Sequence, residues 1–90
     1  MRCEDTFLIK NKLGLHARAA TVLAQLAVQF DTKITLHQDD KEAAGDSVLA
    51  LMLLESSKGK EVKVVCEGPD SEQALHAVGQ LIAQRFNEQE

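Results

Sequence analysis

The sequence predicts an α+β fold, a two-layer open-faced sandwich whose elements follow the order β-α-β-β-α-β-α. Four short stretches have the β-rich or alternating composition of strands, and three others have the apolar content of helices. Because the strands alternate apolar and polar residues, one face of the sheet should be covered while the other meets water. This pattern favours an antiparallel or mixed sheet over a parallel sheet that is covered on both faces. With no linker, repeat or low-complexity tract, residues 1–90 are expected to form a single domain.

The first half of the chain is expected to hold a strand, a helix and a pair of strands. Thr6–Lys10 is a short β-rich run. A helix should extend from about Ala17 to Gln29, a stretch without Gly or Pro in which Ala and Leu dominate. Its apolar face at helical spacing consists of Ala20, Leu23, Ala24, Ala27 and Phe30. Two strands joined by a turn follow, at Lys33–His37 and Lys41–Ala44.

The second half begins with a short helix and a strand. The helix is predicted over Val48–Leu54, and either Asp46 or Ser47 can cap it, because both side chains carry an oxygen that accepts a backbone N–H. The strand at Val62–Cys66 again alternates apolar and polar residues.

The last helix follows the break at Gly68-Pro69-Asp70. Asp70 and Gln73 resemble a capping box. The residues expected on its buried face are Ala74, Leu75, Val78, Leu81, Ile82 and Phe86. The chain end at Asn87–Glu90 is expected to fray.

Composition excludes several classes of protein. The net charge of −4 argues against a nucleic-acid binder, which normally presents a basic face. No apolar run reaches the roughly 18–20 residues that span a bilayer, and the acidic N-terminus does not fit a signal peptide, so we expect a cytoplasmic protein. Cys3 and Cys66 lack the spacing of a metal or redox site. No metal is therefore expected, and Cys66 should act as a small buried apolar residue.

The segment Gly14–Ala20 is the most informative, because it places His16 and Arg18 at the opening of the first helix. A helix N-terminus offers unpaired backbone N–H groups and a partial positive charge, which suit an anion. A neutral imidazole held there can act as a nucleophile, and the planar guanidinium of Arg18 can bind phosphoryl oxygens. These residues predict transient phosphorylation of His16.

Two motifs give the chain a resemblance to a known family. The run Asn11–Arg18, followed further along by Gly45–Leu49, resembles the HPr family, the histidine-containing phosphocarrier proteins of the phosphoenolpyruvate-dependent phosphotransferase system. The resemblance covers essentially the whole chain, and it implies a four-stranded antiparallel sheet with three helices on one face. The acidic balance and the run Ser47–Leu54 look more like the nitrogen-related (NPr) branch than the sugar-transport branch.

The resemblance implies a phosphocarrier without a cofactor, not an enzyme. His16 would accept a phosphoryl group on Nδ1 from an Enzyme I-type donor and pass it to an Enzyme IIA-type acceptor, in sugar uptake or nitrogen-related regulation. Arg18 and the backbone N–H groups of Ala17 and Arg18 would bind the phosphoryl oxygens. Where the family usually has proline after the arginine, this chain has Ala19. Alanine is a strong helix former, so the change should affect the transfer rate and not the chemistry.

The second helix carries two further expectations. Ser47 matches a serine that an ATP-dependent kinase phosphorylates in some family members. Because the helix is apolar all round, part of it should stay exposed and mark a protein–protein site. The resemblance points to Thr21, Val48, Leu49 and Met52 as the partner interface of a monomer, and about half of these could instead fill the core.

Two alternatives remain open from the sequence. One is a regulatory binding module of the same fold, which acts through protein–protein contacts without obligatory phosphotransfer. The other is a small α/β interaction domain in which the histidine motif is coincidental. This second alternative predicts that His16→Ala changes neither labelling nor partner binding.

Overall fold

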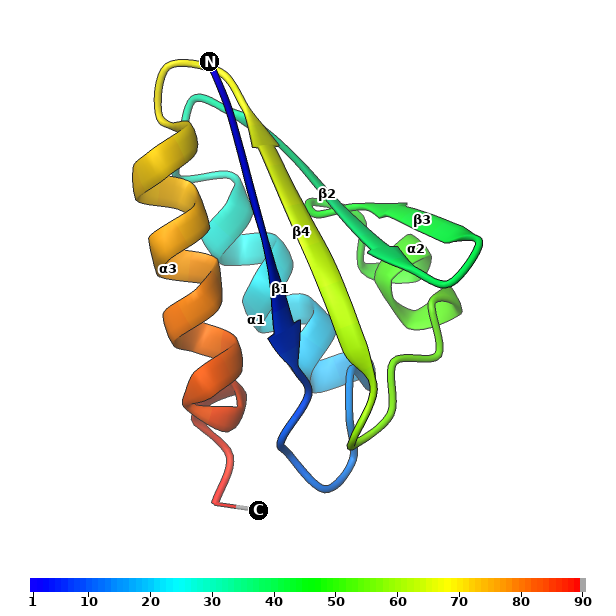
Figure 1. The fold of residues 1–90 in the computed structure, drawn as a ribbon. Helices are drawn as coiled ribbons and strands as arrows, with labels where there is room; N and C mark the ends of the chain where they lie inside the picture. Colours follow the sequence, from blue (N-terminus) through cyan, green and yellow to red (C-terminus); the bar gives the residue numbers. More distant parts are fainter. Residues whose placement is uncertain (90) are drawn as a thin grey trace.

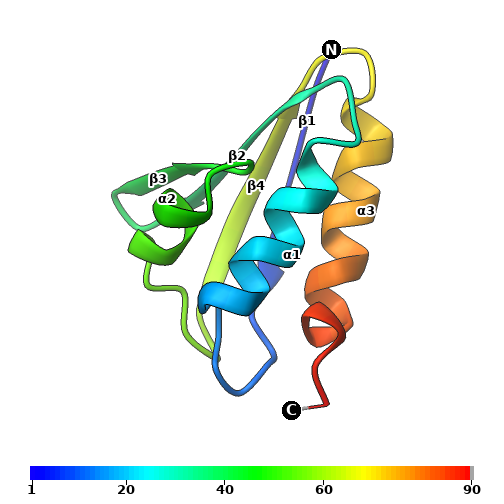
Figure 2. The same cartoon turned by 180° about the vertical axis from the view of Figure 1, so that it is seen from behind.

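In the computed structural model, which describes residues 1–89, a four-stranded antiparallel sheet carries the helices on one face (Figures 1 and 2). The strands are β1 (Arg2–Leu8), β2 (Lys33–Gln38), β3 (Lys41–Ala44) and β4 (Glu61–Glu67), in the order β1-β4-β2-β3. The helices are α1 (Ala17–Ala27), α2 (Val48–Leu53) and α3 (Ser71–Ala83), and the 3₁₀ turn η1 (Arg85–Asn87) follows. The predicted order of elements and the open-faced sandwich are confirmed.

The core lies between the sheet and the helices. β4 runs through the middle of the sheet, and Val62, Val64 and Cys66 on its inner face are fully buried. From the helical layer, α1 contributes an alanine-rich face around Leu23, which lets the helix pack closely, and α3 contributes Val78. Burial of such side chains supplies the main favourable free energy of folding.

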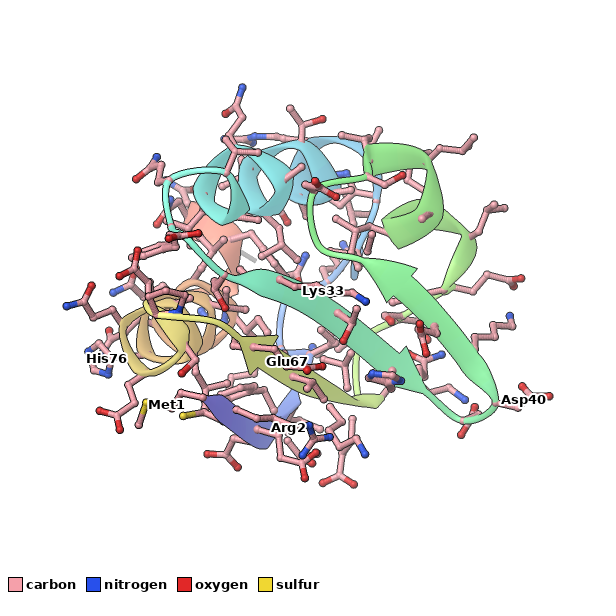
Figure 3. All side chains as sticks on the ribbon, turned by 90° about the horizontal axis from the view of Figure 1, so that it is seen from above. Met1, Arg2, Lys33, Asp40, Glu67 and His76 are labelled. Atoms are coloured by element: carbon pink, nitrogen blue, oxygen red, sulfur yellow. The ribbon has the colours of Figure 1, made fainter. Side chains whose placement is uncertain are left out.

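The open face of the sheet is lined by charged side chains. Glu67 lies opposite Arg2 of β1 and Lys33 of β2 in the register, and all three are labelled on the sheet in Figure 3. Glu4 forms ion pairs with Arg2 at 3.2 Å and with Lys63 at 3.5 Å. Such exposed pairs add little stability, but they keep this face polar, as the alternation in the sequence predicts.

The first strand begins and ends earlier than the sequence predicts. The prediction placed it at Thr6–Lys10 on β-propensity alone, whereas the strand covers Arg2–Leu8 because each of these residues is paired with β4. Pairing with a central strand thus outweighs the local composition.

The ends of all three helices also differ from the prediction, and α2 ends at Leu53, one residue before the predicted Leu54. α1 ends at Ala27, before Gln29. α3 ends at Ala83, so Phe86 is buried from the separate turn η1, whose three residues all have φ between 55° and 65°. The predicted fraying is therefore wrong for Asn87, which belongs to η1, and Glu90 lies outside the described residues.

The caps of α2 and α3 settle two predictions. Ser47, and not Asp46, caps α2, since its Oγ accepts a hydrogen bond from the backbone N–H of Ala50 at 3.2 Å. The predicted capping box of α3 is wrong: Asp70 occupies the N-cap position, but its side chain makes no cap hydrogen bond. Its Oδ2 accepts instead from the backbone N–H of Asp31 at 2.7 Å and so joins two loops at one end of the sandwich.

Cys3 and Cys66 lie opposite each other on β1 and β4 as free thiols. Burial, with a smaller contribution from Cys3, raises the pKa of the Cys66 thiol to about 11. The thiol of Cys66 therefore stays protonated at neutral pH and is a poor nucleophile. Its predicted place as a buried apolar residue is confirmed.

Within residues 1–89, no helix has the length and apolar character needed to cross a membrane. The same residues contain no group of three or more His, Cys, Asp or Glu side chains that could hold a metal ion.

Candidate functional site

The loop between β1 and α1 is fixed by backbone hydrogen bonds to the segment that precedes β4. Ile9 N–H donates to the carbonyl of Lys60, and Gly59 N–H donates to the carbonyl of Ile9, both at 2.9 Å. Further along, Leu15 N–H donates to the carbonyl of Ser56 at 2.8 Å. The chain therefore enters α1 from a defined position at one end of the sheet (Figure 1).

Gly14 permits this close approach. Its φ is +66°, and a Cβ atom built on it would lie 2.3 Å from the carbonyl oxygen of Ser56 and 2.8 Å from the Cα of Ser57. Both neighbours are backbone atoms that cannot move independently of the loop. Only glycine satisfies this position, and the residues immediately after it are consequently held in place.

His16 is the N-cap residue of α1. Its backbone is extended, and its carbonyl accepts the first helical hydrogen bond, from Ala20 N–H at 2.8 Å. No side chain caps the helix start, so the N–H groups of Ala17 and Arg18 are available to a bound anion. The structure therefore places the predicted histidine at an uncapped helix N-terminus.

The imidazole of His16 contacts the end of the chain. Its Nε2 lies 2.5 Å from Oε2 of Glu88, a residue that follows η1. The other carboxylate oxygen of Glu88 accepts a hydrogen bond from Nδ2 of Asn11 at 2.9 Å, and the same Nδ2 donates to the carbonyl of Gly14 at 2.7 Å. Among the residues that the structure describes, Nδ1 of His16 has no hydrogen-bond partner.

Arg18 lines the same site. A surface hollow of about 760 Å³ is bordered by His16, Arg18, Lys12, Glu88 and neighbouring residues of the loop and the chain end. The Arg18 side chain is exposed, and within residues 1–89 its guanidinium forms no hydrogen bond or ion pair, although its charge acts on Glu88. An incoming anion would thus meet a guanidinium and free backbone N–H groups beside the imidazole.

The predicted interface residues divide between surface and core. Thr21 on α1 and Leu49 and Met52 on α2 are exposed, whereas Val48 packs partly against the core. Leu53 was not predicted but is 64% exposed, close to the 69% of Leu49. Leu49, Met52 and Leu53 together form an exposed apolar surface, called here the α2 patch.

The C-terminal end of α2 leads to the surroundings of His16. α1 packs against α2, and the residues that follow α2, Glu55–Ser57, border a second hollow together with His16 and Leu13. Ser47 lies at the opposite end of α2 and borders neither hollow at His16. The structure therefore brings His16 and Arg18 together, close to the residues that follow α2. Ser47, at the other end of α2, lies apart from them.

One residue of the site, Glu88, could not have been found in the sequence. Glu88 lies 72 positions from its partner His16, and 77 positions from Asn11. No periodicity or short motif joins residues at such separations. The sequence shows Glu88 only as an acidic residue near the chain end, and such a residue is more commonly a solvated surface group than part of a site.

The Glu88 carboxyl has a pKa below its ordinary value of 4.5. Burial acts to raise this pKa, but the hydrogen bonds from Asn11 and His16 and the electrostatic interactions with His16 and Arg18 together outweigh it. Because the pKa is lower in the folded protein than in the unfolded chain, the carboxylate stabilises the fold fully above the unfolded pKa. This stabilisation is lost as the pH falls through the folded value.

We therefore expect the free energy of unfolding of the parent to exceed that of Glu88→Gln near neutral pH, and the difference to shrink between about pH 5 and about pH 2. Urea unfolding followed by circular dichroism at several pH values measures both proteins. The two proteins must be compared because the pKa of Glu4 is also lowered, mainly by its hydrogen bond to Arg2. Glu4 contributes the same pH dependence to both proteins, so it cancels in the difference. A difference that stayed constant down to the lowest pH would contradict the stabilising role of the ionised Glu88.

The fold and the site define a class of protein: a small open-faced sandwich whose own histidine, half-buried beside an exposed arginine at a helix N-terminus, can carry an anionic group. Comparisons with known proteins agree with this class. The family model described as "PTS HPr component phosphorylation site" matches residues 3–84. The chain therefore belongs to the HPr family of phosphocarrier proteins of the phosphotransferase system.

Individual relatives extend over nearly the whole chain. The sequence is 46% identical over 87 residues to the phosphocarrier protein NPr of Shewanella violacea, which covers 97% of this chain and 96% of the relative. It is 43% identical over 89 residues to NPr of Escherichia coli K12, covering 98% and 99%. Among solved structures, HPr-C-His from Thermoanaerobacter tengcongensis superimposes with a TM-score of 0.93 at 40% identity, covering 98% of this chain and 99% of that one.

Proposed function

We propose that this protein is a histidine phosphocarrier that accepts a phosphoryl group on Nδ1 of His16 from an Enzyme I-type donor and passes it to an Enzyme IIA-type acceptor. The observation that carries the proposal is the position of His16 at the uncapped N-terminus of α1, with Arg18 on the same hollow. The protein is itself the substrate of two successive transfers and works in the cytoplasm. Membership of the HPr family supports this role.

The transfer step requires only groups that the site holds. The lone pair of Nδ1 attacks phosphorus in line, the N–P bond forms, and the bond between phosphorus and the donor breaks with its electron pair leaving on the donor. Arg18 and the N–H groups of Ala17 and Arg18 stabilise the negative charge on the phosphoryl oxygens. Since these residues are at the surface, the group is held loosely enough to be passed on.

We propose that the relay belongs to the nitrogen-related branch. Relatives at 43–46% identity carry the name NPr, and the acidic composition of the chain agrees with that branch. Proteins named HPr also match, for example that of Cupriavidus necator at 40% identity over 86 residues. Donor proteins of both branches should therefore be compared directly.

The proposed function is tested by incubating the protein with phosphoenolpyruvate and an Enzyme I-type donor of each branch, then measuring intact mass. We expect the parent to gain one acid-labile phosphoryl group and His16→Ala to gain none. His76→Ala is the matched control, since His76 is an exposed histidine on α3, and it should be labelled like the parent. Adding an Enzyme IIA-type acceptor should then remove the group. A parent that stays unlabelled with both donors would rule out the carrier function.

The α2 patch is proposed as the docking surface for these partners. The double variant Leu49→Ser/Leu53→Ser should raise the KM for the phosphorylated donor roughly tenfold, corresponding to about 1.4 kcal/mol of lost binding free energy, with kcat unchanged. Steady-state labelling rates over a range of donor concentrations measure both constants. Val28→Ser is the control, because Val28 at the end of α1 is 70% exposed but lies outside the patch. An unchanged KM in the double variant would mean that the partners dock elsewhere.

The α2 patch is also compatible with one alternative function, that of a regulatory binding module. A regulatory binding module would use the α2 patch without needing phosphotransfer. In that case His16→Ala would still bind the partner with parental affinity, whereas the α2 patch variant would not. The two functions are compatible, and the labelling experiment separates them.

Phosphorylation of Ser47 by a serine kinase stays a prediction. Its hydroxyl caps α2 and is half-buried, so a phosphate there would sit at a helix N-terminus that tolerates negative charge. The added charge would lie beside the α2 patch, and it would weaken the docking of an acidic partner.

A further inference from the structure

The contact between His16 and Glu88 is specific to one nitrogen of the imidazole. The carboxylate is 2.5 Å from Nε2, while Nδ1, the nitrogen assigned above to the phosphoryl group, has no hydrogen-bond partner among residues 1–89. An ionised carboxylate can only accept hydrogen bonds, so a short contact of this kind requires the proton to be on Nε2. In a neutral imidazole the other nitrogen then carries the lone pair.

Glu88 is held in place by contacts that do not depend on His16. Its second oxygen accepts from Asn11 Nδ2 at 2.9 Å, and Asn11 is itself fully buried and tied to the loop through Gly14. On its other side the chain is anchored by Phe86, which is 1% exposed. The Glu88 side chain is only 11% exposed as a result. The loop before α1 and the end of the chain thus hold the Glu88 carboxylate in one position beside the imidazole of His16.

We propose that Glu88 is a positioning residue for phosphoryl transfer: its carboxylate keeps the proton of His16 on Nε2 and directs the lone pair of Nδ1 into the hollow beside Arg18. This inference rests on the proposed function, and it adds a residue to the site whose role follows from its contacts alone. Carboxylates that hold the far nitrogen of a reacting or metal-binding histidine fix the ring in the same way.

A proton on Nε2 of His16 agrees with the movement of electrons and protons in the transfer step. When Nδ1 forms the N–P bond, it donates its own electron pair, and the ring becomes more positive. The proton on Nε2 stays where it is throughout, so no base has to remove one. The neighbouring carboxylate offsets the positive charge that develops on the ring, and this lowers the barrier in both directions of the relay.

An opposite role of Glu88 makes a different prediction. If the carboxylate mainly repelled the phosphoryl group, removing its charge would speed labelling. The geometry favours positioning because the carboxylate contacts Nε2, and not the Nδ1 side from which the phosphoryl group is attacked. The two roles are distinguished by the sign of the effect on the rate.

The test compares the parent, Glu88→Gln and the control Glu67→Gln, which removes the same charge from an exposed position on β4. Proton–nitrogen correlation spectra of the histidine rings, assigned with His16→Ala, report the tautomer of His16 without any phosphorylation. We expect one tautomer, protonated on Nε2, in the parent and in Glu67→Gln, and a mixture in Glu88→Gln. Labelling by the phosphorylated donor should show kcat reduced about tenfold in Glu88→Gln, with KM unchanged.

The outcomes separate this inference from the proposed function. A parent that no donor labels defeats the proposed function, whatever the tautomer of His16. A parent that is labelled, with Glu88→Gln equal to it or faster, overturns the role of Glu88 while leaving the carrier function intact. A slower Glu88→Gln that retains the single parental tautomer also overturns the positioning role, because the effect would then be one of general structure.

Discussion

Phe86→Ala is expected to lower the free energy of unfolding by about 3–5 kcal/mol, the loss typical of truncating a fully buried aromatic side chain. Phe86 is 1% exposed and has the largest side chain among the fully buried residues. It stands in a turn whose residues all have positive φ, a conformation that costs free energy in non-glycine residues. Burial of the aromatic ring offsets that cost, so its removal should release the turn as well as leave a cavity.

Urea unfolding followed by circular dichroism measures this loss, since the protein contains no Trp or Tyr for fluorescence. Phe30→Ala is the matched control because Phe30 is only partly buried, and it should lose less. Phe86→Ala should also be labelled more slowly than the parent under conditions where it is folded, because the turn no longer fixes Glu88. A loss below about 1 kcal/mol would show that the turn is held by something other than the aromatic ring.

Gly14→Ala should have the second largest effect, and it should fall on the site as well as on the fold. The new methyl group would lie 2.3 Å from the carbonyl oxygen of Ser56, and the residue would have to keep a φ of +66°. The loop must therefore shift, and the hydrogen bond from Leu15 to Ser56 should weaken. We expect a loss of roughly 2–4 kcal/mol in the free energy of unfolding, from the clash and the backbone strain together.

Gly59→Ala separates these two causes. Gly59 also has a positive φ, of +90°, but nothing lies within 4 Å of its Cβ position. It should therefore show the backbone strain without the clash, and a smaller loss. In labelling, Gly14→Ala should be slower than the parent while Gly59→Ala stays close to it. Equal losses of stability and rate in both variants would mean that the contact with Ser56 does not position His16.

Local sequence signals were sufficient for the core of the site. His16 and Arg18 could be placed at a helix start because the glycine before them and the alanine-rich run after them act over a few residues. The strands β2 and β4 were found within a residue or so, since each has a buried face that imposes alternation, and β3 was found as the return strand after the turn.

Features that depend on distant pairing were not predictable in this way. β1 is an edge strand with mostly exposed residues, so its extent is set by β4 and not by its own pattern. The turn η1 places three non-glycine residues at positive φ, which local propensity disfavours and only the burial of Phe86 explains. The position of Glu88 depends on that turn. The contact between His16 and Glu88 could therefore be identified only from the folded structure.

The attachment point of the phosphoryl group is the most direct measurement of the central claim. Protein with ¹⁵N-labelled histidine rings would be phosphorylated by the Enzyme I-type donor and studied by ³¹P and ¹⁵N spectroscopy, with His16→Ala for assignment. Coupling of phosphorus to Nδ1 of His16, with Nε2 still protonated, is the expected result. A phosphoryl group on Nε2, on His37 or His76, or on Ser47 would contradict a carrier that works through Nδ1 of His16.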